Sequence, residues 1–279
     1  MNIQRIAAFT HHQQGGNPAG VVITEQFSSA VEMQAIATEV GYSETAFLMP
    51  VEHGWRIRYF SPAMEVPFCG HATIASGAAL ARREGTGHYH LYLNYGEISI
   101  DVDQAENGQF LVALQSPPTS SHPAPQALIN QTLELFQLTE ADLDQHFPIR
   151  LASAGAQHLI LVLKDRSTLA DMNYDFEPTR KLMLDTHLTT INLIWIESAS
   201  RIHARNAFAS GGVYEDPATG AAAAALAGYL RDLNWNDWND QNNFEIVQGE
   251  DMGVPCRLQV AFESQTGSSI RVSGTTRFI

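Results

Sequence analysis

Two loops of the sequence combine ionisable side chains with the start of a helix built from small residues. The first loop, residues 65–71, contains Cys69 and His71, and the second, residues 214–220, contains Asp216. The first N–H groups of a helix have no partner within the helix, and the helix dipole favours an anion there. We therefore expect each loop to hold an anionic group such as a carboxylate.

A glycine begins each of these two helices. Gly70 and Gly220 would let a ligand approach the backbone closely, because glycine has no side chain to stand in its way. The ligand is not expected to be a nucleotide phosphate, since the sequence contains no GxxxxGK(S/T) motif. A small carboxylated molecule is the simpler expectation.

Glu44 is a third ionisable residue of interest, because it enters an apolar strand predicted over residues 45–49. Its side chain could be exposed at the tip of the strand or buried in a cleft. Burial of a carboxylate favours its neutral form, as a general acid or base working near neutral pH requires. A buried Glu44 would thus be a candidate for proton transfer.

Each of these residues also has an ordinary structural explanation. His71 could be a buried, hydrogen-bonded histidine, and Cys69 could be a small core residue. Asp216 and Pro217 could form a turn, or a helix cap with proline in the first helical turn. The residue types alone leave both kinds of role open.

The elements around these residues follow from local sequence signals. Ser29 and Glu32 predict a capping box at the start of a helix that Gly41 is placed to end. A polar turn is expected at residues 237–240. Further strands are predicted over residues 5–9, 21–24, 55–60, 89–95, 98–102, 159–163, 191–196, 202–207, 244–247 and 257–262, and helices over residues 72–83, 128–138 and 221–230.

A proline-rich segment divides the chain into two parts of similar size. Its prolines lack the backbone donors that a helix or a central strand needs, so residues 117–125 are predicted to be an extended linker. Domains are expected on either side, over residues 1–116 and 126–267. Matching small-residue runs begin at Gly70 and Gly220, and each is followed by a glycine turn and a pair of strands. This echo indicates that one plan has been duplicated.

The composition excludes several classes of function. The 279 residues carry 16 Lys and Arg against 30 Asp and Glu, a formal net charge of −14, which disfavours binding to phosphate backbones or anionic membranes. No apolar stretch approaches the roughly 20 residues of a membrane span, and no signal peptide is visible. The 2 cysteines cannot form a disulfide framework. We expect a cytoplasmic protein that binds neither nucleic acid nor membrane.

Several motifs together resemble one protein family. In chain order they are Gly16-Asn17-Pro18-Ala19-Gly20, Ser43-Glu44-Thr45-Ala46-Phe47, the run from Phe60-Ser61-Pro62 to Cys69-Gly70-His71-Ala72-Thr73, and Glu215-Asp216-Pro217-Ala218-Thr219-Gly220. In combination they make the chain similar to the PhzF-like proteins of phenazine biosynthesis, which are relatives of diaminopimelate epimerase. The resemblance extends to Gln248-Gly249 and Val272-Ser273-Gly274, so it covers nearly the whole chain.

This resemblance implies an α+β fold of two similar domains, as in diaminopimelate epimerase. Each domain would be a curved, mostly antiparallel sheet wrapped around a central helix, with the active site in the cleft between the domains. By analogy with the family, the C-terminal strand, residues 268–279, can join the first domain. A homodimer that uses no cofactor is also implied, and no metal site is predicted.

The resemblance further implies roles for individual residues. In the phenazine enzyme a glutamate moves a proton within a cyclic dihydroxyanthranilate-type substrate, and the matching residue here is Glu44. His71 and Asp216 match a histidine and an aspartate near that substrate. The positions that match the lining of the pocket are Asn17, Ser43, Gly70, Ala72, Thr219, Gly220 and Ala221. An isomerase acting on a small anionic metabolite is therefore implied.

Two departures from the family pattern keep other functions open. The family often has a serine where this chain has Ala221, which removes a hydroxyl donor and is compatible with a protein that binds a ligand without catalysis. Cys69 is similar to the first catalytic cysteine of the epimerase relatives, but the loop from Asp216 to Gly220 has no second cysteine. One-base proton transfer through Glu44 is expected, with epimerisation of an amino-acid-like substrate as the alternative.

Overall fold

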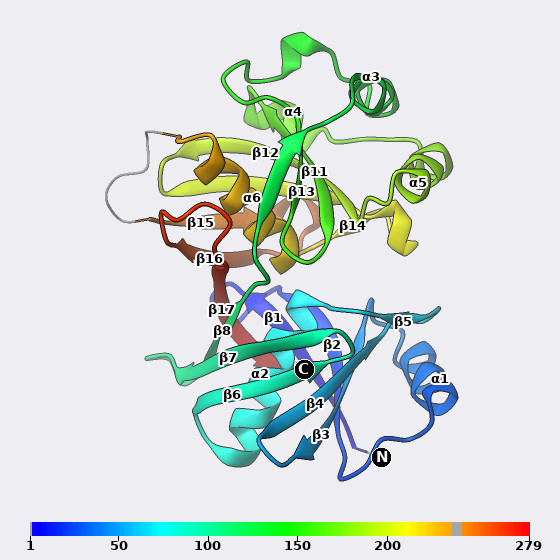
Figure 1. Cartoon of the computed structure of the whole chain (residues 1–279), viewed down its shortest axis with the longest axis vertical. Helices are drawn as coiled ribbons and strands as arrows, with labels where there is room; N and C mark the ends of the chain where they lie inside the picture. The colour runs from blue at the N-terminus through cyan, green and yellow to red at the C-terminus, as the bar shows by residue number, and fades with distance from the viewer. Residues whose placement is uncertain (1, 236–241) are drawn as a thin grey trace. The chain divides into compact units, whose positions relative to one another are not determined.

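The computed structural model describes residues 2–235 and 242–279, which form two units (Figure 1). Unit 1 comprises Met1–Gln115, Val254–Arg257 and Arg271–Ile279, and unit 2 comprises Ser116–Gly253 and Leu258–Ile270. The polar turn predicted at residues 237–240 lies outside the described residues. Within the described ranges, no helix has both the length and the hydrophobicity needed to cross a membrane.

The strands of unit 1 close into a ring, except that the short strand β5 pairs only with β4. They are β1 (Ile3–Thr10), β2 (Asn17–Ile23), β3 (Thr45–Val51), β4 (Gly54–Phe60), β5 (Glu65–Val66), β6 (Gly87–Leu93), β7 (Gly96–Gln104), β8 (Phe110–Gln115) and β17 (Ile270–Phe278). Neighbouring strands pair in the order β1, β2, β3, β4, β6, β7, β8 and β17, and β17 pairs again with β1. The β2–β3 and β4–β6 pairs are parallel and the other pairs of the ring are antiparallel.

Helix α2 (Gly70–Glu84) runs through this ring (Figure 1). Its residues from Gly70 to Ala81 are all buried, and it packs against β1, β2 and β8. The small residues of α2 are what allow this enclosure. At Gly77, for example, an added Cβ would lie 2.5 Å from Val112 Cγ1, closer than a real Cβ approaches another atom.

Helix α1 covers one face of the β2–β3–β4 region and brings Glu44 to the start of β3. It spans Ala30–Val40, with the predicted capping box between Ser29 and Glu32 and with Gly41 in the left-handed conformation at φ 71°. The predicted capping box and the predicted end of the helix at Gly41 are both confirmed. Each depends only on residues that are neighbours in the chain. Met33 and Ala37 of α1 pack on β2, β3 and β4.

Unit 2 repeats the plan of unit 1. Its elements are β9 (Ser120–Pro123), α3 (Gln126–Leu135), η1 (Glu140–Asp142), β10 (Arg150–Ser153), β11 (Gln157–Leu163), α4 (Arg166–Ala170), α5 (Phe176–Asp185), β12 (Thr190–Ser198), β13 (Arg201–Ala207), η2 (Ala209–Gly211), β14 (Glu215–Asp216), α6 (Gly220–Asp232), β15 (Asn243–Gln248), η3 (Glu250–Met252) and the part of β16 (Cys256–Phe262) that begins at Leu258. The β10–β11 and β12–β13 pairs are antiparallel, whereas β11–β12 and β13–β15 are parallel. The same sequence of orientations runs from β1 to β6, which supports duplication and confirms the α+β class.

The proline-rich segment does more than connect the two halves. Within residues 117–125, which were expected to be an extended linker, Ser120–Pro123 forms strand β9 and pairs with β10. The central helix α6 lies close to this segment, because a Cβ added at Gly228 would be 2.7 Å from Thr119 Cβ. Proline is tolerated where a strand does not need that residue's N–H for its ladder, so the composition did not exclude this strand.

Candidate active site

The start of α2 holds two of the predicted site residues. Cys69 is the N-cap residue and makes no capping hydrogen bond with its side chain, so it leaves the first N–H groups of the helix to other partners. His71 and Ala72 follow in the first turn and are 4% and 0% exposed. The positive end of the helix dipole therefore lies at a buried position, where an anion is stabilised most strongly.

Glu44 is buried beside this helix start. Its backbone carbonyl accepts a hydrogen bond of 3.2 Å from the N–H of Gly20, which ties the start of β3 to β2. Only 7% of Glu44 is exposed, so of the two positions that the sequence allows, the structure has the buried one. Helix α1 ends at the left-handed Gly41, and the chain then leads through Glu44 into β3.

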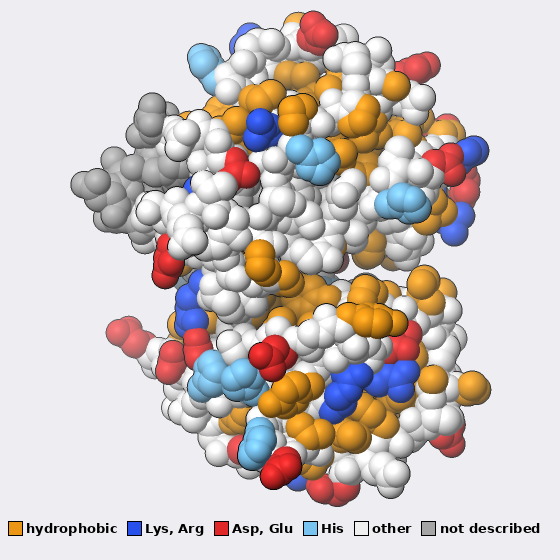
Figure 2. All heavy atoms as spheres, viewed as in Figure 1, with side chains coloured by type: hydrophobic (Ala, Val, Ile, Leu, Met, Phe, Trp, Pro, Cys, Tyr) orange, Lys and Arg blue, Asp and Glu red, His pale blue; other side chains and the backbone are white. Residues whose placement is uncertain are grey.

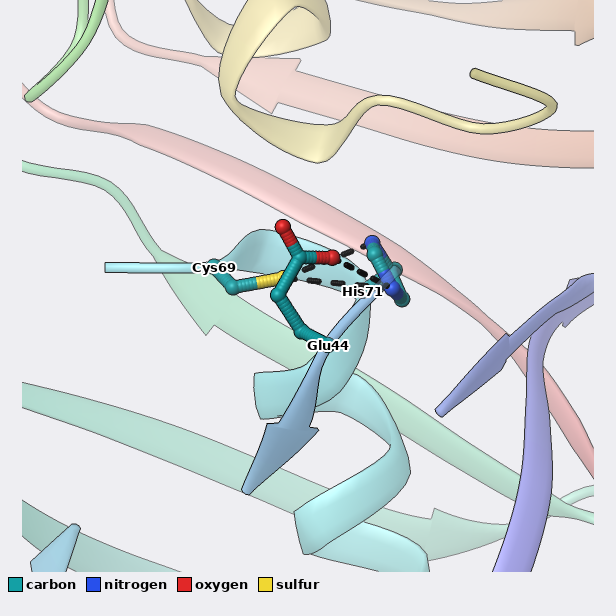
Figure 3. A group of neighbouring side chains, drawn as sticks. All are labelled: Glu44, Cys69 and His71. Atoms are coloured by element: carbon teal, nitrogen blue, oxygen red, sulfur yellow. Dashed lines mark hydrogen bonds and ion pairs between the residues drawn. The ribbon is translucent and has the colours of Figure 1, made fainter. Parts of the chain in front are cut away.

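The side chains of Glu44, Cys69 and His71 converge (Figure 3). Oε2 of Glu44 is 3.3 Å from Nε2 of His71, and Sγ of Cys69 is 3.4 Å from Nδ1 of the same ring. Ser43 Oγ lies 3.2 Å from His71 Nε2. Both ring nitrogens therefore have protein partners, and the imidazole is held in one orientation.

Glu44 Oε2 is buried and has no hydrogen-bond partner among the described residues, since its contact with His71 lacks hydrogen-bond geometry. A buried carboxylate oxygen without a donor is costly, and native proteins rarely keep one without a use. An acceptor that is kept unoccupied beside an imidazole can take a proton from a bound molecule. The arrangement therefore suits general acid–base chemistry.

The hydrogen bonds of the His71 ring depend on which of its two nitrogens carries the hydrogen. With hydrogen on Nε2, the ring can donate to the Ser43 hydroxyl. With hydrogen on Nδ1, it donates to the sulfur of Cys69, and the Ser43 hydroxyl donates to Nε2.

The same three side chains offer a set of ligands for a metal ion. One ligand atom each from Glu44, Cys69 and His71 lies within 4.8 Å of the others. Oxygen, sulfur and nitrogen ligands together suit Zn²⁺ better than Mg²⁺ or Ca²⁺, which prefer oxygen. A zinc ion here would bind Glu44 and replace the hydrogen bonds that His71 makes with Ser43 and Cys69.

The second predicted loop lies in unit 2, where β14 leads into α6. Asp216 is 5% exposed, and its Oδ2 accepts a hydrogen bond of 2.5 Å from Thr219 Oγ1. Gln248 bridges the loop, donating to the carbonyl of Asp216 at 2.7 Å and accepting from the N–H of Thr219 at 3.2 Å. Thr219, not Asp216, is the N-cap of α6, so the capping explanation of Asp216 and Pro217 was wrong.

The start of α6 resembles that of α2. Thr219 makes no capping bond with its side chain, and Gly220 and Ala221 begin the first turn. Acidic side chains are dispersed in small groups over the face of the molecule shown in Figure 2. In a chain of net charge −14, the first N–H groups of such helices are local groups that could attract an anion.

The remaining predicted residues take different positions. Asn17 is the first residue of β2 and is 2% exposed, in the same unit as Glu44 and His71. Gln248 and Arg205, which are not among the predicted site residues, form hydrogen bonds to the segment from Glu215 to Thr219. Gln248 lies in a family motif, which is the available signal, whereas no motif singles out Arg205 among the polar residues of its strand.

His158 is a core residue of unit 2. It is 0% exposed, its Nδ1 lies 2.7 Å from Thr190 Oγ1, and Thr190 in turn donates to Asn206 Oδ1. Burial lowers the pKa of His158 to about 3, because the charged imidazolium would lose its hydration. This histidine is therefore neutral in the folded protein.

Comparison with known proteins agrees with this architecture. The family described as phenazine biosynthesis-like protein, PhzC-PhzF, matches residues 6–278. The uncharacterised isomerase YfhB of Bacillus subtilis is 27% identical over 282 residues, covering 98% of this chain and 94% of the relative. Trans-2,3-dihydro-3-hydroxyanthranilate isomerase of Pseudomonas chlororaphis is 28% identical over 269 residues, covering 96% and 92%.

A solved structure shares the fold over the whole length. The Bacillus anthracis phenazine biosynthesis protein of the PhzF family superposes with a TM-score of 0.86 at 24% sequence identity, covering 99% of this chain and 96% of that one. The resemblance inferred from the sequence motifs is thereby confirmed. The chain belongs to the phenazine biosynthesis-like PhzC-PhzF family and is an isomerase of that family.

Proposed function

We propose that the chain is a cofactor-independent isomerase that moves a proton on a small carboxylated metabolite, with Glu44 as the group that takes and returns the proton. The observation that carries this proposal is the buried Glu44 Oε2, which lies 3.3 Å from His71 Nε2 and has no hydrogen-bond partner among the described residues. The relative from Pseudomonas chlororaphis, named for an anthranilate-type substrate, supports the substrate class.

The reaction requires one base. The Glu44 carboxylate takes a proton from a substrate carbon, so that an O–H bond forms as the C–H bond breaks. The electron pair left on carbon moves into a conjugated double bond, and Glu44 returns the proton to another carbon on the same face. Substrate and product differ only in the positions of one hydrogen and of the double bonds, so no oxidant or reductant is consumed.

His71 and Asp216 are proposed to assist this transfer. The imidazole, held by Ser43 and Cys69, is proposed to stabilise the Glu44 carboxylate when Glu44 is charged. When Glu44 carries the proton, the imidazole is proposed to accept a hydrogen bond from it. Asp216 is proposed to hold a polar group of the substrate. The first N–H groups of α2, at Gly70, are proposed to bind an anionic group of the substrate, and those of α6, at Gly220, are proposed as the corresponding anion-binding groups of unit 2.

The experiment uses trans-2,3-dihydro-3-hydroxyanthranilate as the first probe, in deuterated buffer followed by NMR. The wild-type protein should convert the probe and introduce deuterium at carbon, and Glu44→Gln should slow turnover by about 10²- to 10⁴-fold, as loss of a general base does. Glu39→Gln, a change at an exposed carboxylate on α1, is the matched control and should keep the wild-type rate. Undiminished turnover by Glu44→Gln would refute the assignment.

If the wild type leaves this probe unchanged, other cyclic and amino-acid-like carboxylates are tested for deuterium exchange in the same way. Exchange with any of them that Glu44→Gln abolishes would support the mechanism with a different substrate. Binding of such a compound without exchange would instead support a non-catalytic ligand-binding protein. This alternative is tested because Ala221 stands where the family often has a serine.

An epimerase is the second candidate, and the position of Cys69 favours it. Its sulfur lies 3.4 Å from His71 Nδ1, in the cluster that contains Glu44, so a thiol lies beside the proposed base as a second group able to exchange a proton. Inversion of a chiral carbon by the wild type, and its loss in Cys69→Ala, would support epimerisation. The homodimer that the family resemblance implies stays a prediction, which light scattering would test.

A further inference from the structure

The two halves of the chain share a motif in which a glutamate and a proline precede the glycine of the central helix. In unit 1 these are Glu65, Pro67 and Gly70, and in unit 2 they are Glu215, Pro217 and Gly220. Each glutamate begins a 2-residue strand, β5 or β14. So short a strand forms few ladder hydrogen bonds, so another interaction is needed to fix the loop that it begins.

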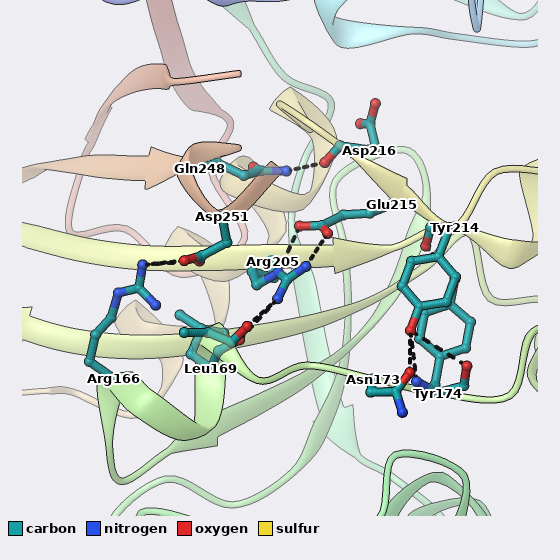
Figure 4. A network of polar contacts seen from close by, with 11 residues as sticks. Arg166, Leu169, Asn173, Tyr174, Arg205, Tyr214, Glu215, Asp216, Gln248 and Asp251 are labelled. Carbon is teal, nitrogen blue, oxygen red and sulfur yellow. Dashed lines mark hydrogen bonds and ion pairs between the residues drawn. The ribbon is translucent and has the colours of Figure 1, made fainter. Parts of the chain in front are cut away.

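An arginine on the neighbouring strand supplies that interaction in unit 2 (Figure 4). Arg205 Nε donates to Glu215 Oε1 at 3.0 Å, and Nη2 donates to Oε2 at 2.5 Å. The third nitrogen, Nη1, donates to the carbonyl of Ala170 at 2.7 Å, at the last residue of α4. The two charged side chains are 10% and 4% exposed. The guanidinium therefore connects β14 to β13 and α4 inside the protein.

Unit 1 contains the same pair at the equivalent place. Arg58 Nε donates to Glu65 Oε1 at 2.8 Å, and its Nη2 donates to Oε2 at 2.6 Å. Asn94 also donates to Glu65 Oε1, at 2.7 Å. Here the side chains of the arginine and glutamate are 21% and 28% exposed, so this pair is less deeply buried. The hydrogen bond from Arg58 lowers the pKa of Glu65, which keeps the carboxylate charged.

The register of the strands is the same in both units. Glu65 lies opposite Phe60 and Glu215 lies opposite Ala207. Each arginine comes two positions before that opposing residue, so arginine and glutamate share one face of the sheet as a diagonal pair. Successive residues of a strand point to opposite faces, and Figure 4 shows the Asp216 carboxylate directed away from the Arg205–Glu215 pair.

We propose that the Arg205–Glu215 and Arg58–Glu65 pairs are duplicated positioning devices, which fix the loops that carry Asp216 and Cys69–His71 into the two central helices. A bidentate arginine–carboxylate contact fixes direction as well as distance, which lysine cannot do with a single ammonium. This inference rests on the proposed function only in treating Asp216 and His71 as residues that meet the substrate. The ordering of the loops is a separate property and can be measured separately.

The test compares Arg205→Lys, which keeps a charge but loses the fork, with the double variant Arg205→Met/Glu215→Met. Replacing both members of a buried ion pair by apolar residues avoids an unpaired buried charge and often preserves stability. Arg201→Met is the matched control, because it removes another arginine of β13 whose bond is to Glu245 on β15. Melting temperature, amide hydrogen exchange of residues 212–222 and kcat/KM are measured for all of them.

The expected result is faster exchange confined to residues 212–222 in both Arg205 variants, with a melting temperature of the double variant near that of the wild type. Misplacement of a site residue by about an ångström costs about 10²-fold, so kcat/KM should fall by about 10- to 100-fold. Arg201→Met should change neither the amide exchange of residues 212–222 nor kcat/KM. Arg58→Lys should correspondingly accelerate exchange in residues 64–72.

A double variant that keeps both the protection of residues 212–222 and the wild-type kcat/KM would overturn the proposal. A wild type that is inactive on every carboxylate probe would count against the proposed function alone, since the exchange measurement would still decide whether the pair orders the loop. If Arg205→Lys does not fold, the double variant decides the outcome.

Discussion

His71 Nε2 lies 3.3 Å from Glu44 Oε2, and the two side chains are 5% and 9% exposed. This contact joins the residue before β3 to the first turn of α2, and the strands β3, β4 and β5 lie between the two in the chain. Exclusion of water strengthens electrostatic interactions between such groups and removes competing proton donors. Several consequences of this arrangement, and of the fold that encloses it, can be measured.

Replacement of His71 should impair catalysis more than replacement of the residue that orients it. His71→Gln removes the imidazole beside Glu44 and should lower kcat by about 10²-fold. Ser43→Ala removes one hydrogen bond to Nε2, worth about 1 kcal/mol, and should lower kcat by about fivefold. Steady-state kinetics, with circular dichroism to verify folding, would check both. Equal effects of the two variants would show that orientation of the ring is the whole contribution of His71.

Zinc should inhibit the enzyme, whereas chelators should not. The ligand atoms of Glu44, Cys69 and His71 lie within 4.8 Å of one another, so Zn²⁺ would occupy the carboxylate that we propose accepts the proton. Activity should be unchanged after treatment with EDTA. Cys69→Ser should require at least about tenfold more zinc for half-inhibition, because a hydroxyl is a much poorer zinc ligand than a thiolate. Loss of activity on chelation, restored by zinc, would contradict the metal-free mechanism.

Stability should fall as the pH is lowered from about 6.5 because of His158. Its pKa is about 3 in the folded protein, below its ordinary value of 6.5, so the unfolded chain binds the proton more tightly. Between these values each pH unit removes about 1.4 kcal/mol, which gives about 2 kcal/mol between pH 7 and pH 5. The contribution is thus complete above the unfolded pKa and is lost toward pH 3. Urea unfolding of the wild type and of His158→Asn at both pH values measures it: the difference between pH 7 and pH 5 should be smaller in the variant by about this amount.

Substitution of Gly228 by alanine should destabilise the protein, although alanine is normally the better helix former. In an open helix this change stabilises by about 1 kcal/mol. In α6 the new Cβ would lie 2.7 Å from Thr119 Cβ, which is attached to the backbone and cannot move alone. Overpacking of this kind costs about 1–3 kcal/mol, and thermal unfolding should show a lower melting temperature. A higher melting temperature would mean that the helix and the segment before β9 separate easily.

Much of the fold could be predicted because the signals are local. The capping box of Ser29 and Glu32 and the left-handed Gly41 depend on neighbouring residues alone, and both are present as predicted. The small-residue runs indicated the two enclosed helices, since only a helix lacking bulk can be surrounded so closely by strands. By contrast, β5 and β14 were not predicted, because a 2-residue strand has no periodicity to detect.

The chain by itself determined its family and the types of residue available for chemistry, through motifs whose order and spacing are visible without a structure. Only the tertiary structure decided that Glu44 is buried, that its Oε2 lies beside His71, and that Arg205 is bound to Glu215. The physical reason is that burial and side-chain contact depend on which segments pack together. Glu44 at the start of a strand could equally have faced solvent, and it is buried because the start of α2, with Cys69 and His71, packs beside it.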